Sequence, residues 1–576
     1  MKKKQLLTLL MTGMLIVTTC CACGNSSATA DSNSSQADTA DQASAADTTD
    51  TKDTTDAADA ADASGEKKSF SVLYTKNAIS MPIAEMKVIT DVEELCNVEL
   101  EVIEVPDEGA DEKISLMINT GELPDVFMEG VSASTILNYQ GQDVFVPVTD
   151  YITPEIMPNL YSILEENPEY RAAMTAPDGE IWGFPYIEEM YGLVCNQGIL
   201  SINTDWLDAL GLDMPTTIDE YKDCLIAFRD NDCNGNGDPN DEIPFMFRIG
   251  ASGIGSWRNN QSIGQFFGCW GQADTGDRLA LTDDGSVICT ATTEAYKEGL
   301  KWFNELYKEG LLWADFALND GAAIQSQLNS EDCTVGSMVV FSIIDMIPAE
   351  RRAMYSAVPY LKGPGGEYGI KDNISEMHNS VSVAITTACE DPEFASSVID
   401  KFFEPQRSVE SNWGSIGLYY VLDENGVMQW NHDVEMPDGI DTFSQLRGYC
   451  TPTRPAIVLS EYYDTVVAYP EDAADLYRDM TTVGFVDKHL NDPIIPPNMW
   501  YSAEDQEQMS LIADNLYNLI DNYNATAIID GNIDATWDSY LSGLEDAGLS
   551  TYLEIVQRNY DAYDLLLDSF LSGVEE

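Results

Sequence analysis

Basic residues are scarce in this chain. Its 29 lysines and arginines stand against 98 aspartates and glutamates, which gives a formal net charge of −69. A surface this acidic repels phosphate groups, and this argues against nucleic acid as a partner. It also repels anionic lipid headgroups, so attachment to a membrane would need an anchor rather than surface charge.

The sequence also lacks the residue patterns of common catalytic and metal sites. None of its three histidines lies near a serine or cysteine in a nucleophile motif, and no Gly-x-Ser-x-Gly or phosphate-binding loop occurs. The nine cysteines beyond residue 68 are isolated, odd in number and without a Cys-x-x-Cys pair. This spacing argues against a zinc site and against a disulfide scaffold.

Long apolar runs are absent beyond the first residues. The run from Leu6 to Val17 is shorter than the about 20 residues with which a helix crosses a bilayer. Three lysines precede it and small residues follow, which is the order of a secretory signal. A cysteine at the cleavage point resembles a bacterial lipobox, whose thiol is lipidated. We predict a lipoprotein signal peptide over 1–23 with lipidation of Cys23; Cys20, Cys21 and an ordinary signal peptide remain alternatives.

Residues 24–68 are almost all Ala, Asp, Ser and Thr, without an aromatic residue. Such a segment buries too little apolar surface to offset the entropy lost on ordering. We expect a disordered acidic tether. With a lipid at one end, it would hold a globular body at the extracellular face of the cell membrane.

The body that follows is too long for one hydrophobic core, since single cores stop growing near about 250–300 residues. Patterns of strand, helix, strand, helix and strand follow one another over residues 70–74, 83–95, 98–102, 112–119 and 124–128. This order predicts a doubly wound α/β sheet, whose ligands bind beyond the carboxyl ends of the strands. Asn77 and Glu129 follow two such ends and are candidate ligand contacts.

Further helices are expected over 203–211, from Thr217 with Glu220 completing a capping box, and over 293–309. Within the last of these, Trp302 sits among core-spaced residues and is expected to pack rather than to bind. The C-terminal region is expected to be mostly helical, over 506–523, 535–547 and 553–571.

Several short segments occur along the body in a characteristic order and at characteristic spacings. They are 120–126 (Thr-Gly-Glu-Leu-Pro-Asp-Val), 179–186 (Gly-Glu-Ile-Trp-Gly-Phe-Pro-Tyr), 203–212, 215–220, 359–366, 413–417, 537–540 and 552–557. Together they resemble the extracellular solute-binding proteins of carbohydrate ABC importers, in the large lipoprotein branch with alginate- and lipo-oligosaccharide-type binders. The usual Gly-Ile-Glu-Gly is here Gly414-Ser-Ile-Gly417, which leaves a contact from that loop open.

The resemblance implies a two-lobed periplasmic-binding-protein-like fold of type II. It also implies a sugar between the lobes, a partner permease and ATPase, and no chemistry on the ligand. Both lobes would be discontinuous. The expected division is 69–190 and 376–430 for the N-lobe, and 191–375 and 431–576 for the C-lobe, the last part with the C-terminal helices.

An acidic loop carries oxygen-bearing side chains on alternate residues. Calcium takes six to eight oxygen ligands, and short side chains at this spacing can surround it, while Gly235 and Gly237 allow the tight turns. The resemblance points the same way, because binders of this branch often carry calcium loops here. A solvated turn is the alternative. We predict a structural calcium site with candidate ligands Asp232, Asn234, Asn236, Asp238, Asp241 and Glu242.

Aromatic rings with neighbouring polar groups suit the C–H faces and hydroxyl rim of a sugar. Trp257, Trp270 and Trp413 lie in glycine-rich loops, and Tyr186 follows Gly-Phe-Pro. With Asn77 and Glu129 they are the candidate ligand-binding residues, although any single aromatic can equally be packing.

These observations predict a membrane-anchored protein, not an enzyme, that delivers a sugar to an ABC importer. The first rival is an exported glycoside hydrolase, which needs two carboxylates about 5–10 Å apart. Glu188 and Glu189 are the tempting local pair, but neighbours on a strand point to opposite faces. A surface glycan adhesin is the second rival. The sequence leaves open which sugar is bound, and whether a peptide is bound instead.

Overall fold

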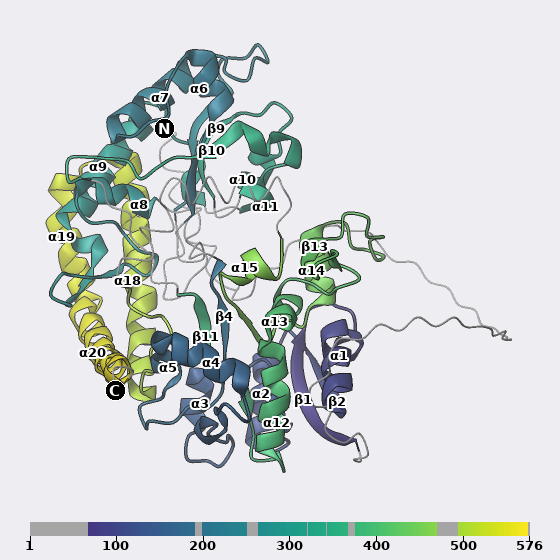
Figure 1. Cartoon of the computed structure of the whole chain (residues 1–576). Coiled ribbons are helices and arrows are strands. Elements are labelled where there is room, and N and C mark those ends of the chain that lie inside the picture. The colour runs from purple at the N-terminus through teal and green to yellow at the C-terminus, as the bar shows by residue number, and fades with distance from the viewer. Residues whose placement is uncertain are drawn as a thin grey trace, which may run out of the picture. The chain divides into compact units, whose positions relative to one another are not determined.

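The structure is a computed structural model that describes residues 67–190, 198–249, 263–318, 321–340, 343–366, 375–468 and 494–573 (Figure 1). All of these belong to one compact unit, Glu66–Glu576. The signal sequence with Cys23, nearly all of the tether, and Trp257 lie outside the described residues. Within the described ranges, no helix is both long enough and apolar enough to cross a membrane.

The larger of two main sheets has six strands in the order β14-β4-β11-β3-β1-β2. β1 is parallel to β2 and β3, β14 is parallel to β4, and β11 runs antiparallel between β3 and β4. The bounds are β1 Lys68–Lys76, β2 Val98–Pro106, β3 Val126–Phe127, β4 Phe184–Glu188, β11 Met377–Ile385 and β14 Ala456–Val458.

The predicted order of strands and helices at the start of the body is confirmed. Helix α1 (Lys87–Cys96) joins β1 to β2, and α2 (Ala110–Thr120) joins β2 to β3. In β2, Val98 and Leu100 are buried whereas Glu99 and Glu101 are exposed, as the alternation indicated. Apolar side chains of these strands and helices, among them Val72 and Ile89, form one continuous core.

Other helices pack around this sheet. Two of them, α13 and α14, lie near its β4–β14 side: α13 contacts β14, and Asn412 at its end is bonded by Arg447 of α14. The bounds are α3 Ala133–Tyr139, α4 Pro158–Glu166, α5 Pro168–Met174, α12 Pro392–Ile399, α13 Pro405–Asn412, α14 Phe443–Cys450 and α15 Tyr462–Thr465. A small antiparallel pair, β12 (Tyr420–Leu422) with β13 (Met428–Trp430), packs beside α14.

The second main sheet has four strands in the order β10-β5-β9-β6 and a separate core. Its strands are β5 Ile199–Asn203, β6 Ile243–Met246, β9 Val335–Val340 and β10 Tyr355–Ala357, and a nearby hairpin pairs β7 (Leu279–Leu281) with β8 (Val287–Cys289). The helices of this part are α6 Thr204–Leu210, α7 Ile218–Asp230, α8 Gly264–Phe267, α9 Glu294–Lys308, α10 Gly321–Leu328 and α11 Ile343–Met346.

Local signals placed two of these helices correctly. The Thr217 side chain accepts from the backbone N–H of Glu220, and the Glu220 carboxylate accepts in return, so the predicted capping box is confirmed. Trp302 of α9 is 8% exposed and stacks on Phe266 with ring centroids 5.6 Å apart. It is therefore a packing residue, as expected.

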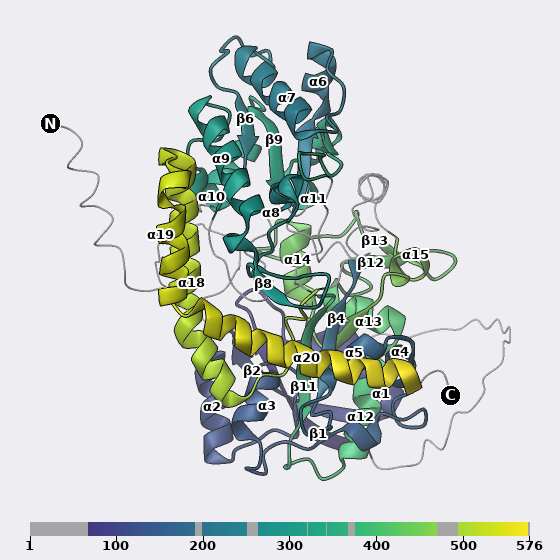
Figure 2. The same cartoon turned by 90° about the vertical axis from the view of Figure 1, so that its left-hand side faces the viewer.

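Three long helices close the chain: α18 (Ala503–Asp530), α19 (Ile533–Asp546) and α20 (Leu549–Gly573). α18 continues past Tyr523, where the sequence pattern predicted its end. Figures 1 and 2 show α20 running from the hairpin of β7 and β8 toward α5, and it contacts both. The first half of α20 supplies Tyr552 and Ile555 to the core of the smaller sheet, whereas Tyr563 also packs against the core of the larger one.

The expected assignment of 431–576 to one lobe needs a correction. β14 lies within that range, yet it pairs with β4 in the larger sheet, with Ala456 opposite Tyr186. β14 has three residues, which is too short for a helical or strand periodicity to show in the sequence. The sequence pattern therefore could not assign this strand to either sheet. The other lobe boundaries stay a prediction.

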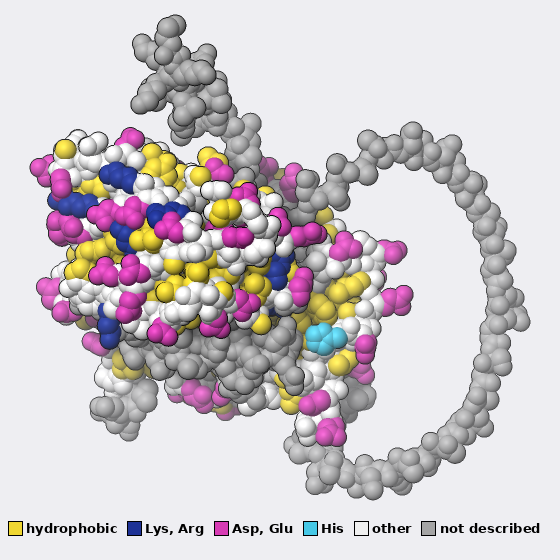
Figure 3. Space-filling view, turned by 90° about the horizontal axis from the view of Figure 1, so that it is seen from above, with side chains coloured by type: hydrophobic (Ala, Val, Ile, Leu, Met, Phe, Trp, Pro, Cys, Tyr) yellow, Lys and Arg dark blue, Asp and Glu magenta, His cyan; other side chains and the backbone are white. Residues whose placement is uncertain are grey.

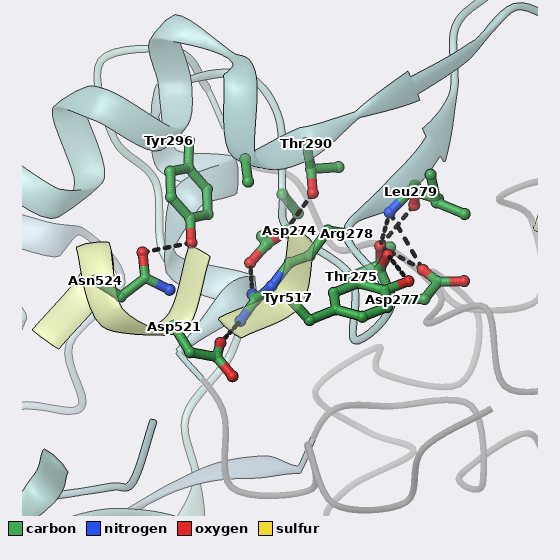
Figure 4. Close-up of polar contacts among 12 residues, drawn as sticks. Asp274, Thr275, Asp277, Arg278, Leu279, Thr290, Tyr296, Tyr517, Asp521 and Asn524 are labelled. Carbon is green, nitrogen blue, oxygen red and sulfur yellow. Dashed lines mark hydrogen bonds and ion pairs between the residues drawn. The ribbon is translucent and has the colours of Figure 1, made fainter. Parts of the chain in front are cut away.

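A buried ionic network fixes α18 to the segment before β7 (Figure 4). Arg278 donates to Asp274, which is 0% exposed at its side chain, and its other amino group lies 3.3 Å from Asp521 of α18. The Thr290 hydroxyl also donates to Asp274. Burial opposes the charge on Arg278, but these carboxylates outweigh it and hold its pKa well above the ordinary value.

The face of the molecule drawn in Figure 3 shows aspartate and glutamate side chains spread widely among few lysines and arginines. Several of the basic side chains are held in ion pairs, for example Lys301 with Asp534 at 2.8 Å. The acidic composition is therefore carried at the surface, as expected of solvated charge.

Candidate functional site

The carboxyl ends of β1, β3 and β4 meet at one edge of the larger sheet, because β11 runs antiparallel to both β3 and β4. Asn77 follows β1, Glu129 follows β3, and β4 ends at Glu188. In parallel arrangements, ligands bind beyond this edge.

Glu129 and Tyr186 meet through a residue far along the chain. Arg454 donates to the Glu129 carboxylate at 2.6 Å, and its guanidinium lies over the Tyr186 ring, 5.1 Å from the ring centroid. The Thr75 hydroxyl donates to the other Glu129 oxygen at 2.5 Å. The opposing face of the cluster carries His378, whose ring stacks on Tyr186 at 5.0 Å.

The cluster is largely shielded from water. The Glu129 and Arg454 side chains are 15% and 24% exposed. Burial raises the pKa of Glu129, although Arg454 counteracts it. Burial, with help from Arg454 and Arg447, lowers the pKa of His378 to about 4, so the ring is neutral near pH 7.

The backbone beside Arg454 is held in an unfavourable conformation. Thr453 has φ of 68°, in the left-handed region that β-branched residues rarely adopt. Such strain concentrates at functional sites, where the surrounding fold maintains it. The Nε atom of Arg454 is buried and has no hydrogen-bond partner within the part of the chain that the structure describes. This leaves a donor for an additional oxygen.

Trp413 belongs to the same network. Its indole Nε1 donates to Glu188 at 2.9 Å, and Arg447 stacks on its ring with Cζ 4.0 Å from the centroid. The amide of Asn412 donates to Glu188, while its oxygen accepts from Tyr186 at 2.8 Å. Trp413 is therefore connected to Tyr186 through Asn412.

Asn77 borders this network rather than entering it. Its amide donates to the backbone carbonyl of Gly448 at 3.2 Å, and its oxygen accepts from the N–H groups of Ile79 and Ser80. Asn77 thus shapes the turn after β1 and joins it to α14, next to Arg447.

The remaining predicted tryptophans do not join this cluster. Trp257 lies outside the described residues. Trp270 is partly buried, packs against the core of the smaller sheet and lies 6.1 Å from Trp302 between ring centroids. Trp270 thus lies with the smaller sheet, whereas Glu129 and Tyr186 belong to the larger one.

Glu188 and Glu189 were expected to point to opposite faces of the strand, and their side chains have different hydrogen-bond partners. Glu189 accepts from the Tyr170 hydroxyl at 2.8 Å and from the backbone N–H of Ser460 at 2.7 Å, neither of which touches Glu188.

Sequence reasoning missed most of the polar partners, namely Asn412, Arg447, Arg454, Tyr463 and His378. Arg454 stands between Thr453 and Pro455 in a stretch without a clear helical or strand period. The one local signal is a charged residue between prolines, in the stretch Thr-Pro-Thr-Arg-Pro over 451–455. Binding residues often lie on loops, but this signal alone does not identify Arg454 as one.

In the acidic loop after α7, some of the predicted calcium ligands are in contact, since Asn234 and Asn236 both lie within hydrogen-bond distance of Asp241. Asn236 donates to Asp241 at 2.7 Å, and Asp232 accepts from the backbone N–H of Gly237 at 3.0 Å. Glu242 turns one oxygen to the N–H of Cys233 at 2.8 Å. Its second oxygen is buried without a hydrogen-bond partner in the described chain.

The side chains of this loop offer oxygen atoms, which are the ligands that a hard cation such as calcium prefers. The positive φ angles of Gly235 and Gly237 allow the tight turns that such a loop needs. Burial raises the pKa of Glu242, and Asp241 and Asp232 add to the rise, so negative charge in the loop is not fully compensated. Among the described residues, however, no three His, Cys, Asp or Glu side chains stand in a metal-binding arrangement. The asparagine and backbone oxygens would have to contribute.

The two separate sheets, crossed several times by the chain, define a two-lobed α/β binding protein with its polar site at the carboxyl ends of the strands. Over residues 87–352 the sequence matches the family described as bacterial extracellular solute-binding protein. A relative, the fructooligosaccharide ABC transporter substrate-binding protein FusA of Streptococcus pneumoniae serotype 4, is 33% identical over 470 residues, which are 78% of this chain and 82% of FusA.

Solved structures agree with this similarity. FusA from S. pneumoniae in complex with kestose has a TM-score of 0.70 and 30% identity, covering 86% of this chain and 100% of that chain. A FusA EF-hand mutant in complex with fructo-nystose has 29% identity and the same TM-score of 0.70, with coverage of 86% and 100%. The chain therefore belongs to the bacterial extracellular solute-binding proteins. The predicted family and type II fold are confirmed.

Proposed function

We propose that this protein captures an oligosaccharide at the site around Glu129, Tyr186, Trp413 and Arg454 and delivers it to the permease of an ABC importer. The observation that carries the proposal is the Arg454–Glu129 pair above the Tyr186 ring, next to the half-buried Trp413. An ion pair offers both donors and acceptors to vicinal hydroxyls, and the half-buried Trp413 offers apolar surface.

The ligand class that we propose is a fructooligosaccharide. The support is the likeness to FusA, whose solved complexes hold kestose and fructo-nystose. In this proposal the ligand leaves the protein chemically unchanged, so the hydrolase rival is set aside.

Titration calorimetry with kestose tests the proposal. We expect saturable binding, together with a change in tryptophan fluorescence because closure around the sugar desolvates aromatic rings. Maltotriose serves as the control sugar and should bind more weakly. Product analysis after prolonged incubation should return intact kestose; cleavage would establish the hydrolase rival, and absence of binding to either sugar would overturn the proposed ligand class.

The proposal includes a lipid anchor at Cys23, which supports capture close to the permease. Replacing Cys23 by alanine should release the protein from cells or leave it unprocessed. If the variant stays lipidated and a Cys20→Ala variant does not, the lipidated residue is Cys20.

We also propose that the loop from Asp232 to Glu242 binds one calcium ion with a structural role. The support is the unpartnered buried oxygen of Glu242, the convergence of Asp232, Asn236 and Asp241, and the EF-hand named for the FusA mutant. The ion would tie the end of α7 to the start of β6, which follows directly after Glu242.

Removal of calcium is expected to lower the melting temperature by several degrees. Losing an ion present at about 100 times its dissociation constant removes about 2.7 kcal/mol of stability. The measurement is a thermal melt with EDTA against millimolar calcium. Asp232→Ala should abolish the difference, whereas Asp284→Ala, in the β7–β8 turn, should leave it unchanged. Identical melts of the wild type under both conditions would contradict the calcium site and leave a solvated turn.

A further inference from the structure

Glu188 is a buried carboxylate surrounded by hydrogen-bond donors. It ends β4 and is 4% exposed. One oxygen accepts from the Tyr463 hydroxyl at 2.5 Å. The other accepts from Trp413 Nε1 at 2.9 Å and from the amide of Asn412. An ionised carboxylate is an acceptor only and can satisfy all three donors.

Glu188 accepts hydrogen bonds from Trp413 and Asn412, which belong to the proposed sugar site or contact it. Trp413 Nε1 donates to Glu188 and also to the Tyr463 hydroxyl at 2.8 Å, a hydroxyl that is itself bonded to Glu188. Arg447 covers one face of the Trp413 ring. Because the amide nitrogen of Asn412 is engaged by Glu188, its oxygen is turned toward Tyr186 and Arg447, at 2.8 and 3.0 Å. Tyr186 in turn lies beneath Arg454. A continuous series of contacts therefore runs from Glu188 to the proposed sugar contacts.

We propose that Glu188 is the positioning residue of this site: its ionised carboxylate holds Trp413 and Asn412 in their binding geometry, and uptake of a proton weakens that hold. This rests on the proposed function, since the site that Glu188 organises is the sugar site. A protonated carboxyl has lost the charge that strengthens these hydrogen bonds, and its own hydrogen needs an acceptor, which the Tyr463 hydroxyl can provide. Trp413 and Asn412 are then held by neutral hydrogen bonds, which are about half as strong.

The surroundings of Glu188 place its protonation near pH 7. Burial raises the pKa of Glu188 to about 7, although the hydrogen bonds from Tyr463 and Trp413 and the charge of Arg447 counteract the rise. As pH falls through 7, Glu188 in the folded protein takes up a proton. In the unfolded chain the pKa of this glutamate is near its ordinary value of 4.5, so the unfolded chain does not yet bind that proton. Affinity for the sugar should therefore fall on acidification, while folding itself is not weakened.

The other groups facing Glu188 do not titrate in the same range. His378 of β11 has its pKa lowered to about 4 by burial and the two nearby arginines. Burial raises the pKa values of Tyr186 on β4 and Tyr420 on β12 above those of an exposed tyrosine. The guanidinium of Arg447 on α14 also faces Glu188. Tyr463 of α15 and the Asn412–Trp413 corner after α13 complete the surroundings.

The decisive variant is Glu188→Gln, which keeps the size of the side chain but replaces one acceptor oxygen by an NH₂ donor. Kestose affinity is measured by calorimetry at pH 8 and pH 6. We expect the wild type to bind about 10-fold more weakly at pH 6, whereas Glu188→Gln binds about 10-fold more weakly than wild type at pH 8 and shows little further change. Glu189→Gln is the matched control, because Glu189 binds Tyr170 and Ser460 instead, and should keep the wild-type pH profile.

A ligand-free readout separates failure of this inference from failure of the proposed function. Near-UV circular dichroism of the sugar-free protein should show a transition near pH 7 that is lost in Glu188→Gln and in Trp413→Phe and kept in Glu189→Gln. If the transition is present but kestose does not bind, the positioning role stands and the sugar assignment fails. If Glu188→Gln keeps a wild-type pH profile in both measurements, the inference is wrong.

Discussion

Replacing Arg454 by alanine is expected to weaken kestose binding at least about 100-fold. Arg454 is the partner of Glu129 at 2.6 Å and covers the Tyr186 ring. Its removal deletes a charged donor and leaves the buried Glu129 carboxylate with the Thr75 hydroxyl as its hydrogen-bond donor among the described residues. Losing one partner of a buried charged hydrogen bond at a binding interface costs about 2–5 kcal/mol of binding free energy, and about 2.8 kcal/mol corresponds to about 100-fold in affinity.

Calorimetry with kestose measures this effect, with the melting temperature recorded in parallel. Arg454→Lys keeps the charge but not the planar fork, and should fall between wild type and Arg454→Ala. Arg229→Ala is the control, since Arg229 pairs with Asp230 at the surface and should retain wild-type affinity. If Arg454→Ala folds and binds kestose with undiminished affinity, this cluster is not where the sugar binds.

Replacing Arg278 by methionine is expected to destabilise the fold by about 3–5 kcal/mol, because Asp274 would remain buried without its charged partner. Arg278 also joins Asp521 of α18, so the loss should loosen the C-terminal helices from the smaller sheet (Figure 4). Denaturant unfolding followed by circular dichroism measures the change. A protein with two cores need not unfold in one step, so the transition that includes α18 is the relevant one.

The double variant Asp274→Leu with Arg278→Met provides the control for this prediction. Replacing both members of a buried ion pair by apolar residues of similar volume is often neutral, so stability should largely return. Kestose affinity should change little in either variant, because Arg278 precedes β7 and pairs with α18, whereas Glu129 follows β3 of the larger sheet. An unchanged unfolding curve for Arg278→Met alone would show that the ion pair contributes nothing to stability.

Features that depend on neighbours along the chain could be predicted from the sequence. The capping box of Thr217 and Glu220, the alternation in β2 and the burial of Trp302 all follow from side chains within a few positions of one another. Such short-range patterns repeat with the period of a helix or strand and can be read directly. The order of these elements and the spaced family segments were sufficient to predict the fold and the family.

The assembly of the site depends on contacts between residues far apart in the sequence. Arg454 and Glu129 are 325 residues apart, and Tyr463 and Glu188 are 275 apart. Their meeting depends on β14 joining the larger sheet beside β4, a pairing of three residues that no local pattern announces. The physical reason is that a buried charge needs a partner in space, and the fold can supply that partner from anywhere along the chain. Glu188 thus looked from the sequence like half of a carboxylate pair, whereas its surroundings make it an acceptor for three donors.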